Sequence, residues 1–233
     1  MRRTVTAELL DSDSGSDREV RASLADLARI NRWFGGISTS RLLIERAILR
    51  SDTNSQSGKK EVRLLEVGAG SGDVPLAIRR ELRRKGVELH LTLLDRNASH
   101  LSPAQDVQRI AADACQLPFR DSSFDVVSCG LMVHHLWPEQ VASFLNEALR
   151  VASLAVIVND LRRSRAHLAA VYAGFPLYTS RLTRHDAPAS VRAAYTRGEL
   201  EAMLQNTSAA AVEINDHYLF RMGAIAWKKS PVI

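Results

Sequence analysis

An apolar run that ends at an acid and three glycines is the stretch of this sequence most clearly suited to chemistry. Residues 64–73 read Leu-Leu-Glu-Val-Gly-Ala-Gly-Ser-Gly-Asp, and an amphipathic segment follows at residues 74–85. This order is typical of a buried strand, a tight turn and a helix. Glycines let a backbone turn through positive φ and let a ligand come close, and the free N–H groups at a helix start attract an anion. The stretch therefore predicts a ligand-binding turn in an α/β domain.

Three acidic residues stand at the ends of three successive predicted strands. Glu66 lies near the end of the first strand, Asp95 ends the second and Asp113 follows the third. Ligands of open α/β sheets bind at the carboxyl ends of the strands, so the three carboxylates are expected at one site. A carboxylate offers only acceptors, which suits Asp95 to the two hydroxyls of a ribose.

The spacing of the glycines separates this turn from two other nucleotide-binding motifs. Asp73 occupies the slot in which a dinucleotide-binding fingerprint carries its last Gly or Ala. A P-loop requires Lys after its last glycine, and no Lys follows Gly72. Both alternatives are therefore excluded.

Histidines supply the candidate catalytic groups. His134 and His135 follow the fourth predicted strand, and a His titrates close enough to neutral pH to take a proton from a phenol or an acidic carbon. Packing against the following helix is the alternative for this pair. His185, beside Asp186, is a third candidate, with an exposed loop position as its alternative. Which of the three acts as the base stays open, and Asp160 could orient a His or contact the substrate.

The elements that must position these residues alternate between strands and helices. Strands are predicted at residues 62–67, 89–94, 107–111, 124–128 and 154–158, with helices at 73–85 and 138–151. Thr196 and Glu199 form a capping box that begins a helix reaching residue 204. The apolar runs 211–220 and 223–228 are joined too tightly for a parallel crossover. The sequence thus predicts an α/β fold, a doubly wound, mostly parallel sheet of seven strands with an antiparallel last strand.

Three regions are distinguished by composition. Residues 1–17, rich in Ser and Asp, predict a flexible tail. Residues 18–60 predict an N-terminal helical cap that ends in a polar linker, and the Asn-Arg-Trp-Phe-Gly-Gly of residues 31–36 predicts a mobile lid. Residues 61–233 form the main domain. Within it, residues 161–195 are expected to be an irregular insert over the acceptor pocket.

Two motifs of the main domain resemble a known family. Residues 66–72, Glu-Val-Gly-Ala-Gly-Ser-Gly, resemble motif I of the class I methyltransferases that use S-adenosylmethionine. Residues 117–127, Leu-Pro-Phe-Arg-Asp-Ser-Ser-Phe-Asp-Val-Val, resemble the signature of the subgroup that includes quinone-biosynthesis methyltransferases. The resemblance extends over residues 61–160. It implies the Rossmann-like methyltransferase fold, with S-adenosylmethionine as cofactor.

The resemblance also implies a role for each acid. Glu66 would steady the glycine loop and help hold the methionyl amine, Asp95 would bind the ribose, and Asp113 would accept from the adenine amino group. The predicted cofactor-binding residues are Glu66, Gly68, Ala69, Gly70, Gly72, Asp95, Arg96, Asp113, Ala114 and Cys129. No metal ligand is predicted.

The expected acceptor is a small aromatic molecule. Methyltransferases of adenine or of glutamine amides carry (Asp/Asn)-Pro-Pro-Tyr where residues 129–132 read Cys-Gly-Leu-Met, and cytosine-C5 enzymes carry Pro before their Cys, where Ser128 precedes Cys129. The predicted activity is O-methylation of a phenolic or quinol-like metabolite, as in secondary metabolism. The alternatives are C-methylation of a quinol-like ring, a module that binds the cofactor without catalysis, and an RNA methyltransferase.

Composition limits the partners and the compartment. The net charge is +5, and the aromatic content of 6% is low for a nucleic-acid groove, so no nucleic-acid partner is expected. Cys115 and Cys129 lie in or beside apolar runs, which indicates reduced thiols. Neither a signal peptide nor an apolar run long enough to span a membrane is evident. A cytoplasmic protein is expected, and a homodimer is compatible with the sequence.

Overall fold

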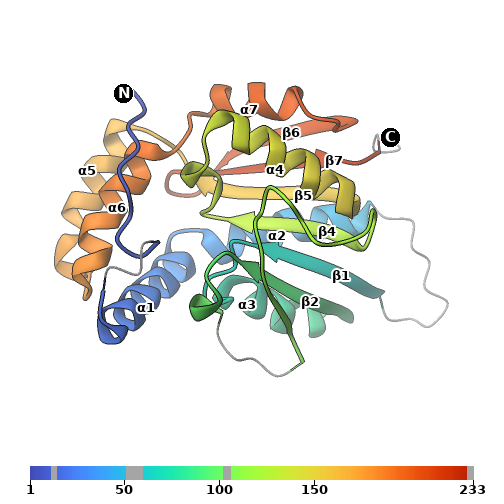
Figure 1. Cartoon of the computed structure of the whole chain (residues 1–233), viewed down its shortest axis with the longest axis horizontal. Helices are drawn as coiled ribbons and strands as arrows, with labels where there is room; N and C mark the ends of the chain where they lie inside the picture. The colour runs from blue at the N-terminus through green and yellow to red at the C-terminus, as the bar shows by residue number, and fades with distance from the viewer. Residues whose placement is uncertain (12–14, 51–59, 102–105, 230–233) are drawn as a thin grey trace.

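Seven strands form a single sheet in the computed structural model, which describes residues 1–11, 15–50, 60–101 and 106–229 (Figure 1). The strands are β1 Lys60–Val67, β2 Val87–Asp95, β3 Gln108–Ala111, β4 Phe124–Gly130, β5 Ala152–Leu161, β6 Ala211–His217 and β7 Arg221–Trp227. Their order in the sheet is β3-β2-β1-β4-β5-β7-β6. The first five run parallel, and β7 runs antiparallel to both neighbours. The predicted doubly wound sheet with an antiparallel last strand is confirmed.

The turn between the last two strands lies earlier than the sequence pattern predicts. β6 ends at His217 and β7 begins at Arg221, so the turn occupies residues 218–220 rather than 221–222. Leu219 and Phe220 both adopt positive φ, 45° and 68°. Large side chains seldom take this conformation, and no Gly or Asn marks the turn. The run of apolar residues therefore continues through the turn, which is why the sequence pattern placed the turn too late.

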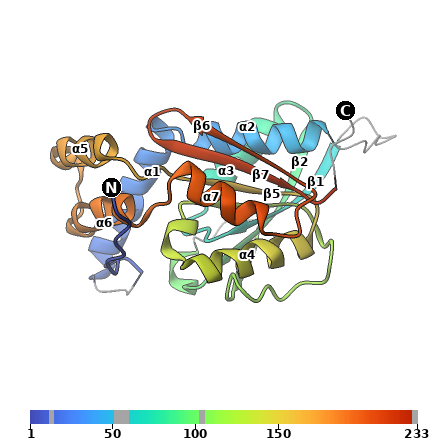
Figure 2. The ribbon, with the colours of Figure 1, turned by 90° about the horizontal axis from the view of Figure 1, so that it is seen from above.

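Helices cover both faces of the sheet. They are α1 Asp17–Trp33, α2 Gly36–Leu49, α3 Asp73–Arg83, α4 Pro138–Val151, α5 Arg165–Ala173, α6 Arg181–Ala193 and α7 Arg197–Gln205. α2 and α3 pack on one face, and α4 and α7 on the other (Figure 2). In β1, Leu65 packs on the α4 side and Leu64 on the α2 side, which is why the strand is apolar on both faces. No helix of the described ranges has the length and apolar character needed to cross a membrane.

α1, α5 and α6 form a helical cap beyond the carboxyl ends of the parallel strands (Figure 1). The structure corrects two expectations here. The insert at residues 161–195 is mostly helical rather than irregular, and Pro188 inside α6 is the residue that obscured its helical pattern. Of the region 18–60, only α1 joins the cap, because α2 packs on the sheet. The polar linker at its end lies, except for Lys60, outside the described residues.

A buried carboxylate ties α1 to the beginning of α6. Asp26 accepts hydrogen bonds from the backbone N–H of Thr179 at 2.9 Å, from its hydroxyl at 2.7 Å and from the N–H of Ser180 at 2.9 Å. Its side chain is 1% exposed, and Arg29 pairs with it at the surface. Because three donors converge on one buried acceptor, Asp26 determines how the cap is closed at this end.

The change Asp26→Ala is expected to destabilise the protein by about 2–4 kcal/mol, since it leaves the buried N–H of Ser180 and the partly buried N–H of Thr179 without an acceptor. Urea unfolding monitored by tryptophan fluorescence measures this loss. Asp17→Ala, on the exposed first turn of the same helix, is the matched control and should change stability by less than about 1 kcal/mol. Equal stability of the two variants would contradict the assigned role of Asp26.

The joint between α1 and α2 is fastened to the sheet by a buried guanidinium. Arg221 of β7 donates to the carbonyl of Phe34 at 3.2 Å and to Oδ1 of Asn31 at 2.9 Å. Trp33 is 61% exposed, and neither aromatic of residues 31–36 lines the cavity described below. The predicted lid over the cleft therefore lacks its aromatic surface in this structure, and only Asn31 and Gly36 of the segment face the cavity.

The N-terminal segment, residues 1–11, is packed against the molecule where the sequence predicted a flexible tail over residues 1–17. Arg3 donates from Nε to the carbonyl of Ala193 at 2.6 Å, and from Nη2 to the carbonyls of His134 and Leu136 at 3.0 Å each. Its guanidinium also lies 4.3 Å from the ring centroid of Tyr195. These contacts join the segment to α6 and to the residues that follow β4. They could not be predicted from the sequence, because residues 1–11 have no periodic pattern of apolar residues.

Candidate active site

A cavity of about 600 Å³ opens at the carboxyl ends of the parallel strands, between the sheet and the cap. Its volume falls in the range of small-molecule sites. The glycine turn after β1 forms one wall: Gly68 and Gly70 have φ of 67° and 51°. A Cβ on Gly68 would lie 2.6 Å from Cγ of Met132, whereas a Cβ on Gly70 would meet nothing within 4 Å. Gly68 thus allows close packing, and Gly70 leaves open space for a ligand.

Glu66 is a buried acid that faces this space. It is 4% exposed and is among the cavity-lining residues. Burial raises the pKa of Glu66 to about 7, and a hydrogen bond with Ser128 lowers it only in part. A carboxyl in this environment favours a cationic partner, which fits the methionyl ammonium of S-adenosylmethionine.

The side chains of Asp95 and Asp113 are held in place by hydrogen bonds from backbone N–H groups. Asp95 accepts from the N–H of Gly70 at 2.8 Å and from that of Asn97 at 3.0 Å. Asp113 accepts from the N–H of Cys115 at 2.8 Å. Each carboxylate keeps acceptor capacity toward the cavity. The two acids suit the ribose hydroxyls and the adenine amino group, so the residues present fit the cofactor.

Eight of the ten predicted cofactor residues line one cavity: Glu66, Gly68, Ala69, Gly70, Asp95, Arg96, Asp113 and Ala114. Gly72 and Cys129 do not. Gly72 precedes α3, where a Cβ would lie 2.7 Å from Cδ1 of Leu93, and so serves packing. The Cys129 thiol is buried behind the wall, and burial with the nearby Glu66 and Asp160 raises its pKa.

If Asp95 binds both hydroxyls of the ribose, the change Asp95→Ala should weaken the binding of S-adenosylhomocysteine by about 2–4 kcal/mol, because two charge-assisted hydrogen bonds are lost. Titration calorimetry measures the change. Asp106→Ala, outside the cavity lining, is the control and should bind as the unaltered protein does. Unchanged affinity in Asp95→Ala would remove Asp95 from the cofactor site.

The histidine pair lines the same cavity from the short turn Val133–His135 after β4. Nδ1 of His134 lies 2.6 Å from Oδ1 of Asp160, and the His134 backbone N–H donates to Oδ2 at 3.2 Å. His135 is half-buried, and its Nδ1 lies 2.8 Å from Oδ2 of Asp11. His185 lies on α6 outside the cavity lining and pairs with Asp186 at 2.8 Å. The structure thus brings His134 and His135 together at the cavity and leaves His185 apart.

Carboxylates control the charge of His134. Burial by itself would lower the pKa of His134, but Asp160 and Glu8 outweigh it and raise the pKa to about 10. The same contact holds the pKa of Asp160 below its usual range, although burial acts in the opposite direction. With Glu8 in place, His134 is therefore an imidazolium at neutral pH rather than the neutral base that its ordinary pKa suggests.

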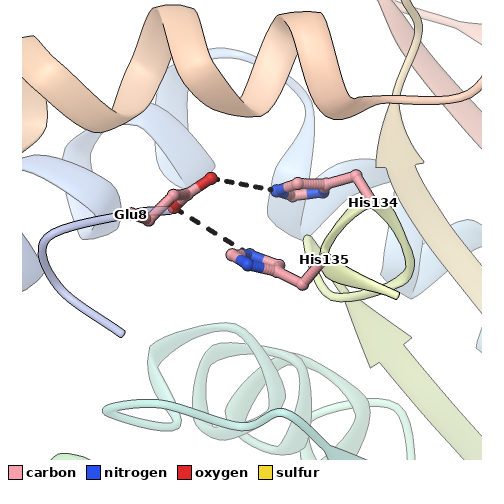
Figure 3. A group of neighbouring side chains, drawn as sticks. All are labelled: Glu8, His134 and His135. Atoms are coloured by element: carbon pink, nitrogen blue, oxygen red, sulfur yellow. Dashed lines mark ion pairs between the residues drawn. The ribbon is translucent and has the colours of Figure 1, made fainter. Parts of the chain in front are cut away.

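Glu8 is a site residue that the sequence pattern did not reveal. It lies in the N-terminal segment and faces both histidines (Figure 3). Ser190 of α6 donates to Oε1 of Glu8 at 2.6 Å, and the N–H groups of Leu9 and Leu10 donate to Asp186. The only available signal was an acid in a Ser- and Asp-rich stretch, which composition assigns to a tail.

Helix α1 and helix α6 supply an apolar wall beside the histidines. Leu24, Leu27 and Ile30 line the cavity from α1, and Val191 lines it from α6. The half-exposed Tyr172 lies outside this lining. The apolar wall and the polar histidines together make a pocket suited to a small, largely apolar molecule that carries one polar group.

Comparisons with known proteins agree with this geometry. The family model described as "Methyltransferase domain" matches residues 65–154. The ubiquinone/menaquinone biosynthesis C-methyltransferase UbiE of Rhizobium meliloti (strain 1021) is 26% identical over 183 residues, 69% of each chain. UbiE of Rickettsia prowazekii (strain Madrid E) is 31% identical over 98 residues, which cover 38% of this chain and 39% of that one.

A solved structure shows the same fold over nearly the whole chain. The plantazolicin methyltransferase BpumL, in complex with a monoazolic desmethylPZN analog and SAH, superposes with a TM-score of 0.63 at 16% identity and covers 91% of each chain. The glycine turn, the three strand-end acids, the sheet order and these likenesses agree. The chain thus carries a methyltransferase domain at residues 65–154 and resembles the quinone-biosynthesis enzymes among the class I S-adenosylmethionine-dependent methyltransferases.

Proposed function

We propose that this methyltransferase acts on the hydroxyl of a phenolic or quinol-like small molecule and forms a methyl ether. One observation carries the proposal: His134, which is paired with the buried Asp160, lines the same cavity as the acids Glu66, Asp95 and Asp113. Bound S-adenosylmethionine supplies a methyl group that is attached to a sulfonium, and the thioether that remains is a good leaving group. The protein must then position the acceptor oxygen and favour its ionised form.

His134 favours ionisation by its charge. An imidazolium within hydrogen-bond reach of a hydroxyl stabilises the oxyanion and lowers the pKa of that hydroxyl. Because His134 already carries its proton at neutral pH, the proton of the acceptor hydroxyl leaves to solvent, and the imidazolium stabilises the oxyanion that attacks the methyl group. Asp160 fixes the ring so that Nε2 is directed away from β5.

The surroundings of His134 support a flat, apolar acceptor. Leu24, Leu27 and Ile30 of α1 present an aliphatic surface to the cavity, and Tyr178 presents an aromatic ring. His167 also lines the cavity and stacks on Phe220 with ring centroids 4.8 Å apart. Burial lowers the pKa of His167 to about 4, so this side chain is neutral. Binding an aromatic ring against such a wall removes apolar surface from water.

C-methylation of a quinol-like ring is the second candidate. It is favoured by the curated relatives, which are named ubiquinone/menaquinone biosynthesis C-methyltransferases. The same ionised hydroxyl would activate the ring carbon beside it, so the roles of His134 and Asp160 would be unchanged. Only the position of the ring in the cavity decides which atom receives the methyl group.

Incubation with methyl-labelled S-adenosylmethionine and a panel of phenols, quinols, amines and carboxylic acids tests the proposal. A labelled methyl ether formed from phenols or quinols is expected, and NMR of the product distinguishes an ether from a ring methyl. Turnover confined to amines or acids would contradict the proposal. Cofactor binding with no product from any acceptor would instead favour a module without catalysis.

A further inference from the structure

Three potential metal ligands converge at the cavity. One ligand atom each from Glu8, His134 and His135 lies within 4.8 Å of the others (Figure 3). The histidines are neighbours on the turn after β4, whereas Glu8 arrives from the N-terminal segment. We propose that these three residues bind a divalent transition-metal ion of the zinc type.

The distances between the ligand atoms favour a shared ion over direct hydrogen bonds. Nε2 of His134 lies 3.7 Å from Oε1 of Glu8, and Nε2 of His135 lies 4.0 Å from Oε2. Both distances exceed the N–H···O range of about 2.7–3.2 Å. Two ligands of a tetrahedral zinc ion, with bonds of about 2.0–2.2 Å, lie about 3.3–3.6 Å apart. All three ligand atoms lie within 4.8 Å of one another, so small side-chain movements toward a shared ion would complete the site.

Each histidine is already oriented as a metal ligand requires. Nδ1 of His134 pairs with Asp160 at 2.6 Å, and Nδ1 of His135 pairs with Asp11 at 2.8 Å. Both rings thus keep Nε2 for Glu8 and the space beside it. A carboxylate on the second nitrogen of a metal-bound histidine fixes its tautomer and raises its basicity. Two such pairs that converge on one acid are the strongest evidence for the site.

The charges around the histidines also suit a cation. Three carboxylates, those of Glu8, Asp11 and Asp160, contact two imidazoles. Ser190 holds Glu8 from α6 and the backbone N–H of Leu161 holds Asp160, so two of the three acids have fixed positions. Metal-bound imidazoles are neutral, so the three carboxylates would leave an excess of negative charge. A bound divalent ion would offset this excess.

The ligand set selects the class of metal. Two imidazoles with one carboxylate suit zinc and related borderline ions, whereas magnesium prefers oxygen ligands alone. Three protein ligands leave a fourth position, and all three line the cavity that receives the acceptor. If the proposed function is correct, the ion would replace the proton on Nε2 of His134 and take over the positive charge of the imidazolium, and it would lower the pKa of an acceptor hydroxyl in the fourth position as a Lewis acid.

Metal binding by tag-free, full-length protein tests the proposal directly. After treatment with a chelator, equilibrium dialysis against Zn²⁺ should give one tightly bound ion per chain, and Co²⁺ should give visible absorption bands of a low-symmetry site. A large excess of Mg²⁺ should not displace either ion. Failure to retain Zn²⁺, or displacement by Mg²⁺, would overturn the proposal.

Variants locate the ion. Glu8→Gln and His135→Asn should each weaken Zn²⁺ binding at least tenfold and alter the Co²⁺ spectrum. His90→Asn, an exposed position on β2, is the matched histidine control and should change neither. Equal binding in all four proteins would place the metal elsewhere and refute the assignment.

Neither measurement uses an acceptor, so the metal site and the proposed function can fail separately. A protein that binds Zn²⁺ but methylates no phenol would keep the site and lose the function. Phenol methylation that is unaffected by chelator, in a protein with no affinity for Zn²⁺, would keep the function and lose the site.

Discussion

Replacement of His134 by Gln is expected to lower kcat/KM for methyl transfer at least 100-fold, while S-adenosylhomocysteine binds within about threefold of its original affinity. The loss follows because the group that stabilises the ionised acceptor oxygen is removed, and such groups typically contribute about 10²–10⁴ in rate. Asp95 and Asp113 are held by backbone N–H groups of Gly70, Asn97 and Cys115, not by His134, and keep these contacts. Initial rates and titration calorimetry measure the two effects.

An acceptor series separates this chemical role from a structural one. Phenols whose hydroxyl pKa lies below 7 are already ionised at neutral pH and need no help from His134. The loss caused by His134→Gln should therefore shrink as the acceptor pKa falls. His185→Asn, which lies outside the cavity lining, should leave the rates unchanged. An equal loss for every acceptor would show that His134 only supports the turn after β4.

Asp160 provides a check on the folding of these variants. His134→Gln leaves a buried carboxylate without its partner, which by itself destabilises the protein. The double variant with Asp160→Asn removes the buried charge and should regain thermal stability without regaining rate. A double variant that regained rate would contradict a direct role for His134.

Replacement of Glu66 by Gln is expected to stabilise the cofactor-free protein at pH 8 by up to about 3 kcal/mol. The pKa of Glu66 is about 7 in the folded protein against 4.5 for an unperturbed Glu, and one unit of difference corresponds to about 1.4 kcal/mol. Between these two values the folded state binds more protons than the unfolded state. Stability therefore falls as the pH rises from about 4.5 through 7. Gln does not titrate, so the variant should lack this decline.

The same substitution should weaken cofactor binding. The methionyl ammonium stabilises the ionised form of Glu66, so S-adenosylhomocysteine should release a proton and bind more tightly as the pH rises from 6 to 8. In Glu66→Gln the affinity at pH 8 should fall about 10- to 100-fold and lose this pH dependence, because a hydrogen bond to a charged group is lost.

Urea unfolding from pH 5 to 8, with calorimetry in buffers of different ionisation enthalpy, measures both effects. Glu61→Gln, an exposed acid on the same strand, is the control and should change neither quantity. A wild-type protein whose stability rises from pH 5 to 8 by the same amount as that of Glu66→Gln would contradict the raised pKa.

Local sequence signals predicted the elements of the main domain well. The helix with Pro at its start was predicted at residues 138–151 and is observed as Pro138–Val151. The capping box of Thr196 and Glu199 begins α7 as expected. Apolar runs, caps and glycine turns are signals that extend over a few residues, so these elements can be predicted directly from the local sequence.

The cap and the surroundings of the histidine pair could not be predicted in the same way. α6 contains Pro188, which is a helix-breaking signal, yet its N-cap Ser180 and its contacts with α1 sustain a helix. Residues 1–11 have the composition of a tail, and they are held by Arg3 and by Asp186 of α6. Tertiary contacts supplied the stabilisation that local propensity lacked.

The glycine turn, the acids at the strand ends and the histidine pair were determined by the sequence alone, because their spacing along the chain reflects the geometry of one βα unit after another. Only the tertiary structure decided that Glu8 faces His134 and His135, and that His134 is charged. Those facts depend on segments far apart in the chain that fold together, and on burial that changes the pKa of each group. The cofactor could therefore be predicted from the residues, whereas the chemistry around His134 and His135 could be inferred only from the folded structure.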